Sequence, residues 1–125
     1  MKYLTDSRFE KELRTLAKKF RSLPEDFEIL KRFSIEFFHA ADAKGSNSIF
    51  KIEGCCNDRF ESYIIKKVAC KSLKGKGCKS GIRITYVLDK HLNTVIFMEM
   101  YFKADKKIED KERLKEFIER TREKA

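Results

Sequence analysis

The residues best suited to chemistry gather in one short stretch of the sequence. Residues 66–83 carry seven basic side chains and no acidic one, whereas the whole chain has 29 Lys and Arg against 20 Asp and Glu, a formal net charge of +9. Because a solvated charged face normally mixes the two signs, this stretch indicates a site for a polyanion. A lysine-rich loop kept for solubility is the alternative. The seven residues are Lys66, Lys67, Lys71, Lys74, Lys76, Lys79 and Arg83.

A cluster of Lys and Arg suits the chemistry of a phosphodiester. A guanidinium offers a planar fork of donors to phosphate oxygens, and a lysine is a point charge whose pKa falls when like charges surround it. RNA carries its own nucleophile, the 2′-hydroxyl. Its cleavage therefore needs only a base near that oxygen, cations around the developing phosphorane and an acid for the leaving 5′-oxygen. No metal or cofactor is required.

Strand parity predicts where Arg83 points. Two-residue alternation in 82–86 places Arg83 and Thr85 on the face opposite Ile82, Ile84 and Tyr86. If Ile82, Ile84 and Tyr86 pack under helices, Arg83 faces outward. An outward Arg83 has either a catalytic role or a structural one in an ion pair at the sheet edge.

The neighbours of Arg83 depend on a strand register that the sequence does not fix. Lys67, Ala69 and Lys71 are expected on one side of it. On the other side, either Glu99 and Tyr101 or Met98 and Met100 share its face, and Glu99 is more readily a salt-bridge partner than a general base. The rim is expected to be closed by three lysines after the last strand, which are Lys103, Lys106 and Lys107.

The elements that must position these residues follow from periodicity and capping. Ser7 with Glu10, and Ser22 with Glu25 around Pro24, predict two helices that form a hairpin over about 7–41. The stripe of the second helix is Phe27, Leu30, Phe33 or Ser34, and Phe37, widened by Ile35 and Phe38. Strands are predicted at 49–52, 62–72, 82–88 and 94–102, the last in a central position, and a terminal helix at 107–124. The order ααββββα gives one α+β domain over residues 1–125.

Composition excludes several classes of protein. No run approaches 18 apolar residues and the first residues lack an apolar signal region, so neither a membrane span nor export is expected and the predicted location is cytoplasmic. The four cysteines, Cys55, Cys56, Cys70 and Cys78, lack the spacing of a zinc site, and reduced thiols are the expectation.

Several segments resemble the toxin of RelE-type toxin–antitoxin pairs. The resemblance covers nearly the whole chain and is weakest between about 42 and 62. Its most specific part is a Gly-x-Arg-hydrophobic-x-Tyr strand, Gly81 to Tyr86, followed by an aromatic strand and a basic corner. The segments that carry it are 69–75, 80–86 and 97–106, with Glu109, Asp110 and Arg113 following and 16–26 fitting the helical hairpin.

The resemblance implies a fold like that of small microbial ribonucleases, with an N-terminal helical hairpin on a twisted antiparallel four-stranded sheet and a C-terminal helix. The RelE branch of this superfamily cuts mRNA in the ribosomal A site without a metal, and the ParE branch inhibits DNA gyrase. Arg83 matches the arginine that contacts the scissile phosphate, and Lys71 with Lys67 or Lys66 matches the family's basic pair. Lys103 or Lys106 stands near a second catalytic arginine.

One position departs from the family pattern. RelE-type toxins commonly have a Tyr or His near the terminal helix, where this sequence has Glu109 and Asp110, and Tyr101 or Tyr86 is the candidate substitute.

These observations predict an mRNA-cleaving toxin whose partners are mRNA on the ribosome and an acidic antitoxin, with no membrane, metal or cofactor. A ParE-like gyrase inhibitor and a member that binds RNA or antitoxin without cutting are the alternatives. The predicted catalytic residues are Lys67, Lys71, Arg83, Lys103 and Lys106. The predicted RNA contacts are Lys66, Lys74, Lys76, Lys79, Tyr86, Tyr101 and Lys107.

Overall fold

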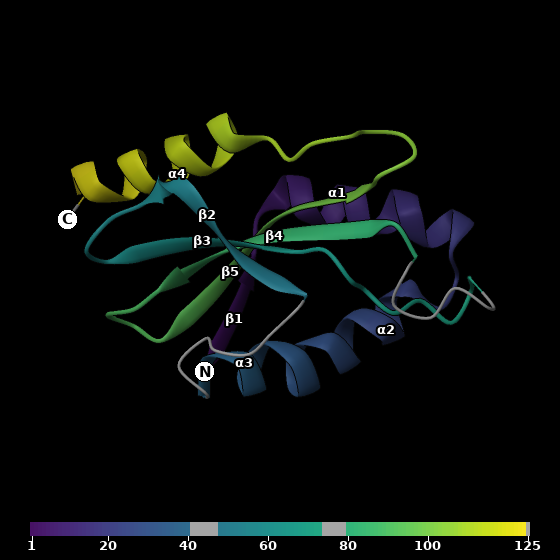
Figure 1. Ribbon diagram of the computed structural model, residues 1–125. Helices are drawn as coiled ribbons and strands as arrows, with labels where there is room; N and C mark the ends of the chain where they lie inside the picture. Colours follow the sequence, from purple (N-terminus) through teal and green to yellow (C-terminus); the bar gives the residue numbers. More distant parts are fainter. Residues whose placement is uncertain (41–47, 74–79, 125) are drawn as a thin grey trace.

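The protein folds around a single five-stranded sheet with helices on both sides (Figure 1). The computed structural model describes residues 1–40, 48–73 and 80–124. Its strands are β1 (Lys2–Thr5), β2 (Ile49–Cys56), β3 (Phe60–Ile65), β4 (Ile82–Asp89) and β5 (Thr94–Phe102). Its helices are α1 (Ser7–Lys19), α2 (Leu23–Leu30), the π-helical turn η1 (Lys31–Ile35), α3 (Glu36–Ala40) and α4 (Lys111–Lys124). The predicted α+β class is confirmed.

The prediction of four antiparallel strands is wrong in one respect. The strand order is β1-β5-β4-β3-β2, and the additional strand β1 lies parallel to β5, with Lys2 opposite Thr94 and Thr5 opposite Phe97. Four residues just before a helix carry too little periodicity to be identified from sequence. Their pairing covers one end of β5, which places β5 inside the sheet as predicted.

A bulge in β5 decides which of its side chains share a face. Thr85 of β4 lies opposite Glu99, but the next residue, Tyr86, lies opposite Phe97, so Met98 is an extra residue in the ladder. Such a bulge turns two consecutive side chains toward the same side. Met98 and Glu99 therefore both point away from the helical hairpin.

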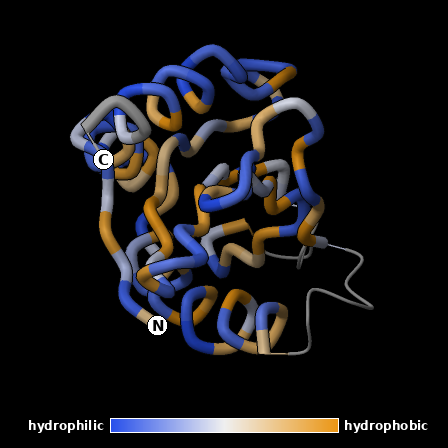
Figure 2. The backbone as a smooth tube through the Cα atoms, turned by 90° about the vertical axis from the view of Figure 1, so that its left-hand side faces the viewer, coloured by the Kyte–Doolittle hydropathy of each residue, from blue (hydrophilic) through white to orange (hydrophobic). Residues whose placement is uncertain are grey.

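One side of the sheet, which we call the helix side, packs against residues of α1, α2, η1 and α3. Figure 1 shows α2 and α3 below the strands, whereas α1 is above them in this view. Phe9, Phe27 and Phe97 pack there with centroids 4.7–5.4 Å apart, and Tyr86 stacks on Tyr63. Figure 2 shows hydrophobic segments running through the middle strands while the helices alternate hydrophobic and hydrophilic turns. Burial of this aromatic surface is the main stabilising contribution.

The π-helical turn changes which face of the second helix is buried. The Glu36 backbone N–H donates to the Lys31 carbonyl, one residue farther back than in an α-helix, which rotates the apolar stripe. Ile35 and Phe38 are therefore buried, whereas Phe33 and Phe37 are 70% and 74% exposed. The sequence predicted Phe37 in the core because a helix with a constant period was assumed.

The opposite side of the sheet, the α4 side, is only partly covered. Leu114 and Ile118 of α4 pack on Ile52, Val87 and Met98. This smaller core lies over one end of the strands. The other end, where β4 begins and β5 finishes, carries the connection 103–110 instead, on the same side as α4 (Figure 1).

Several predicted boundaries are corrected. β2 ends at Cys56 rather than at residue 52, and β3 begins at Phe60 rather than at residue 62. The strand predicted at 62–72 ends at Ile65, because the chain then crosses to α2, where the Asp26 carboxylate accepts from the Lys71 N–H at 3.1 Å and Ser22 Oγ accepts from the Ser72 N–H at 2.8 Å. The terminal helix begins at Lys111 rather than at 107. α1 is capped by Asp6, whose carboxylate accepts from the Arg8 N–H, and not by Ser7.

Candidate nucleic-acid interface

Three residues form a row across the end of the α4 side that α4 leaves uncovered, where Tyr101 is buried beneath the connection 103–110. Arg83 lies directly opposite Tyr101, and the β3–β4 register, with Ile65 opposite Ile84, continued by one residue brings Lys66 beside Arg83. The ladder does continue to this point on the other edge of β3, because the Lys66 N–H donates to Ser48 O at 2.7 Å. Antiparallel partners share a face, so this row presents two cations and a phenol together.

Arg83 has a side chain that no carboxylate among the described residues neutralises. It is half-buried, its Nε is buried with no acceptor, and within residues 1–40, 48–73 and 80–124 no carboxylate forms an ion pair with it. An arginine in an ion pair at the sheet edge, the alternative raised by the sequence, is therefore not found in this part of the chain. A partly desolvated guanidinium without a counter-charge favours an external anion.

Gly81 explains how β4 delivers Arg83 to this place. Its φ of +85° lies in the left-handed region, and a Cβ there would come 3.2 Å from the Phe102 ring. Glycine is the residue that adopts this conformation at no steric cost. The glycine two residues before the arginine thus starts the strand against the end of β5.

Tyr101 links the row to the connection before α4. Its hydroxyl donates to Glu109 at 3.5 Å, and Lys106 Nζ lies 5.8 Å from its ring centroid. Burial and the Glu109 charge raise the pKa of Tyr101 to about 12, although the Arg83 charge acts in the opposite direction. The phenol therefore stays protonated at neutral pH and can serve as a hydrogen-bond donor.

A buried carboxylate fixes the position of Lys106 in the connection before α4. Glu99 is 2% exposed, forms an ion pair with Lys106 and accepts the Asp110 N–H at 2.9 Å. The prediction that Glu99 is a salt-bridge partner is confirmed, and its partner is Lys106 rather than Arg83. The bulge at Met98 places Glu99 on this side, so the position of Lys106 depends on that irregularity.

An exposed aromatic ring extends the row toward β2. Phe50 lies opposite Ile64 on the α4 side, is 41% exposed, and has Lys66 Nζ 5.2 Å from its ring centroid. Cations beside exposed aromatic rings are typical of surfaces that bind single-stranded nucleic acid. We call Phe50, Lys66, Arg83, Tyr101 and Lys106 the basic face.

The structure does not bring all of the predicted residues to the basic face. Lys71 forms an ion pair with Glu25 of α2 at 3.2 Å, on the helix side. Tyr86 is fully buried on the helix side and cannot contact RNA there. Lys67, Lys103 and Lys107 are exposed outside regular structure, and Lys74, Lys76 and Lys79 lie outside the described residues.

Sequence reasoning missed Phe50 and did not assign Glu109 a role in the site. A signal for Phe50 exists, since it is an aromatic residue at an outward position of a short strand, but its partner strand had to be known. Glu109 was noted only as a departure from the family pattern.

In the described ranges, no three His, Cys, Asp or Glu side chains are grouped so that they could hold a metal ion, and Cys78 lies outside those ranges. No helix of the described chain is long and apolar enough to cross a membrane.

Comparison with known proteins gives a sparse result. No protein-family model matches the chain, and no curated protein matches it significantly. Among solved structures it is similar to a chain in the crystal structure of an archaeal RelE-RelB complex from Pyrococcus horikoshii OT3. The two are 13% identical, the similarity covers 82% of this chain and 93% of the other, and the TM-score is 0.49. A similarity this low does not assign the chain to a family, so the resemblance to RelE-type toxins stays a prediction.

Proposed function

We propose that the protein binds RNA on the basic face and cleaves it, as the toxin of a toxin–antitoxin pair. The observation that supports this most directly is Arg83, a half-buried guanidinium without a carboxylate partner among the described residues, in a row with Lys66 and Tyr101. The two cations match the phosphates of a single strand, and the ring exposed to stack on an unstacked base is Phe50 rather than Tyr101, which is 6% exposed.

The proposed reaction is a transesterification. The 2′-oxygen attacks the adjacent phosphorus, its proton passes to a base, and the bond to the 5′-oxygen breaks as that oxygen receives a proton. Arg83 stabilises the charge on the phosphorane. Glu109, next to the Tyr101 hydroxyl, is the carboxylate best placed to accept the proton, and Lys106 is the proposed donor to the leaving oxygen.

This assignment modifies the sequence prediction for the lysines. A lysine was expected to act as base, with Lys71 in the site. Because Lys71 is paired with Glu25 on the helix side, we propose that it takes no part in cleavage and that Lys66 supplies the second cation at the phosphate.

The proposed protein partner is an acidic antitoxin. A chain with a formal net charge of +9 attracts a polyanionic segment at long range, and such a segment covering the basic face would exclude RNA.

The test is to map mRNA ends in cells after brief induction of the wild type and of variants. Arg83→Ala should remove the new ends and the growth arrest without lowering the melting temperature. Arg32→Ala is a matched control, since this exposed arginine lies on η1, on the helix side of the sheet. Lys71→Ala should cleave as the wild type does.

Purified protein with ribosomes and mRNA completes the test. Binding should weaken with salt with a log–log slope of about −0.7 for each neutralised phosphate, and Lys66→Gln should reduce that slope by about 0.7. Intact mRNA together with relaxation of supercoiled plasmid in cells would overturn the proposal in favour of a gyrase inhibitor.

A further inference from the structure

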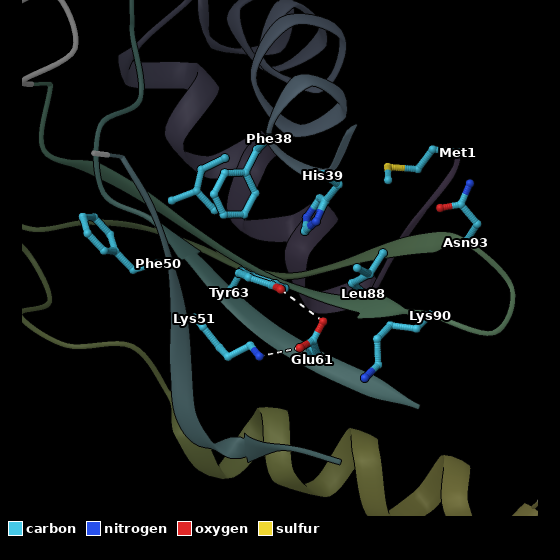
Figure 3. Close-up of a pocket in the computed structure, with 11 residues that line it drawn as sticks. Met1, Phe38, His39, Phe50, Lys51, Glu61, Tyr63, Leu88, Lys90 and Asn93 are labelled. Atoms are coloured by element: carbon cyan, nitrogen blue, oxygen red, sulfur yellow. Dashed lines mark hydrogen bonds and ion pairs between the residues drawn. The ribbon is translucent and has the colours of Figure 1, made fainter. Parts of the chain in front are cut away.

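A concave site lies on the helix side of the sheet, and it shares only Phe50, at the β2 edge, with the basic face. It is a cavity of about 720 Å³ between the end of α3 and the strands β2, β3 and β4 (Figure 3). Binding sites for small molecules typically enclose roughly 300–1,000 Å³, so the volume suits a ligand of that class. The lining includes Phe38, His39, Lys51, Glu61, Tyr63, Leu88 and Lys90.

The inner wall of the cavity is aromatic and held in place by its own contacts. The His39 and Tyr63 rings meet edge to face with centroids 5.0 Å apart, and Phe38 meets Tyr63 at 5.8 Å. Tyr63 also stacks on Tyr86, whose hydroxyl lies 2.7 Å from His39 Nε2. Rings locked against one another form a preorganised surface, which lowers the cost of binding a flat apolar group.

The rim of the cavity has two lysines around one carboxylate. Glu61 forms an ion pair with Lys51 and accepts a hydrogen bond from the Tyr63 hydroxyl at 3.2 Å, and Figure 3 shows Lys90 reaching toward Glu61 from the other side. Burial alone raises the pKa of Glu61, but the hydrogen bond from Lys51 and the charges of Lys51 and Lys90 outweigh it and lower the pKa. Burial likewise lowers the pKa of His39, so at neutral pH this ring is uncharged. The side chains of the lining thus carry one net positive charge.

We propose that this cavity binds a small molecule that joins a flat ring system to a single anionic group. The ring lies against Phe38, His39 and Leu88, and the anion lies between Lys51 and Lys90. A cationic ring is repelled by the two lysines, and an anion without a ring leaves the aromatic wall exposed to water. Aromatic acids and mononucleotides share this chemistry.

The test adds four probes in turn to the full chain and measures binding by the NMR chemical shifts of backbone and aromatic groups. 1-Naphthoate and AMP should bind and shift Phe38, His39 and Leu88 but not Arg83. Inorganic phosphate and 1-naphthylmethylamine should bind at least about fivefold more weakly, which corresponds to one charge or one ring contact. Tighter binding of AMP identifies a nucleotide as the source, and tighter binding of 1-naphthoate identifies an aromatic acid.

Three variants are expected to change the affinity for 1-naphthoate in different ways. Lys90→Gln should weaken binding and Glu61→Gln should strengthen it, each by about three- to tenfold, because the first removes an attractive charge and the second a competing one. Lys103→Gln, an exposed lysine beyond β5, should change nothing. The proposal is overturned if 1-naphthylmethylamine binds as tightly as 1-naphthoate, or if inorganic phosphate binds as tightly as AMP. It is also overturned if none of the four probes binds, or if Glu61→Gln binds 1-naphthoate more weakly than the wild type does.

Discussion

Arg83 on β4 and Arg113 on α4 have opposite surroundings. Arg113 of α4 is 5% exposed and donates to Glu12 at 2.9 and 3.2 Å and to Asp6 at 3.2 Å. Arg83 has no carboxylate partner among the described residues, although the Nε of both arginines lacks an acceptor. Arg113 joins α4 to α1, while the terminal nitrogens of Arg83 stay available.

The difference gives Arg113 a structural role and leaves Arg83 as the cation that we propose to be functional. The Glu12 carboxylate that holds Arg113 also accepts the Met100 N–H at 3.2 Å, so this clamp covers the edge of β5 beyond β1. Removing a charge from such a network leaves its partners unpaired, whereas removing Arg83 leaves no buried carboxylate behind. One substitution made at both positions should therefore give opposite results.

The largest effect is expected from Arg83→Met on RNA cleavage. The phosphorane loses its guanidinium, and removal of one such stabilising group costs about 10²- to 10³-fold in rate. The melting temperature should stay within a few degrees of the wild type, because no ion pair is lost. Single-turnover cleavage and thermal unfolding of the same sample measure both quantities. A large drop in stability would show that Arg83 is structural after all.

Arg113→Met should reverse this pattern. The free energy of unfolding is expected to fall by about 2–3 kcal/mol, since Glu12 and Asp6 lose their shared partner in a partly buried site. Urea unfolding measures the loss. Cleavage at low temperature, where the variant is folded, should be retained, and a rate as low as that of Arg83→Met would remove the distinction between the two arginines.

Glu99→Gln tests whether Glu99 positions Lys106, and a smaller effect on cleavage is expected. Glutamine keeps an oxygen for the Asp110 N–H but loses the charge that fixes Lys106. We expect a loss of about five- to tenfold in cleavage, because a donor is less well positioned, with little change in RNA affinity. If affinity falls and the rate of the bound complex does not, Lys106 binds RNA without taking part in the reaction.

The smallest effect concerns His39 on the helix side. Burial lowers the pKa of His39 in the folded state below the value near 6.5 of the unfolded chain. The unfolded state thus binds the proton first, and stability falls as the pH drops below about 6.5. Urea unfolding at pH 7.5 and 5.5 should show a smaller decrease for His39→Gln than for the wild type. The exposed His91→Gln should match the wild type.

Much of the architecture could be predicted because it depends on local patterns. Helical periodicity predicted the hairpin, although neither predicted cap is found, since Asp6 caps α1 and Ser22 makes no side-chain cap of α2. Alternation in 82–86 placed Arg83 away from the helices. Errors arose where a regular period fails. The π-helical turn exposed Phe33 and Phe37, and the Asp26 and Ser22 contacts ended β3 before Lys67.

The composition of the basic face could not be predicted in the same way. The sequence left two sets of β5 residues open, Glu99 with Tyr101 or Met98 with Met100. The bulge resolves this, since it turns Met98 into the α4 core and leaves Glu99 and Tyr101 beside Thr85 and Arg83. A one-residue change of register exchanges the faces of a strand.

The sequence by itself determined that positive charge is concentrated before and at β4 and that Arg83 faces away from the main core, because composition and alternation are properties of the chain alone. Only the tertiary structure decided that Lys66 lies over Phe50 on the α4 side, that Lys71 pairs with Glu25 on the helix side, and that Lys106 is held by Glu99. The physical reason is that such neighbours depend on strand register, on a single bulge and on a hydrogen-bonded crossing to α2, and each of these results from contacts between residues distant in the chain.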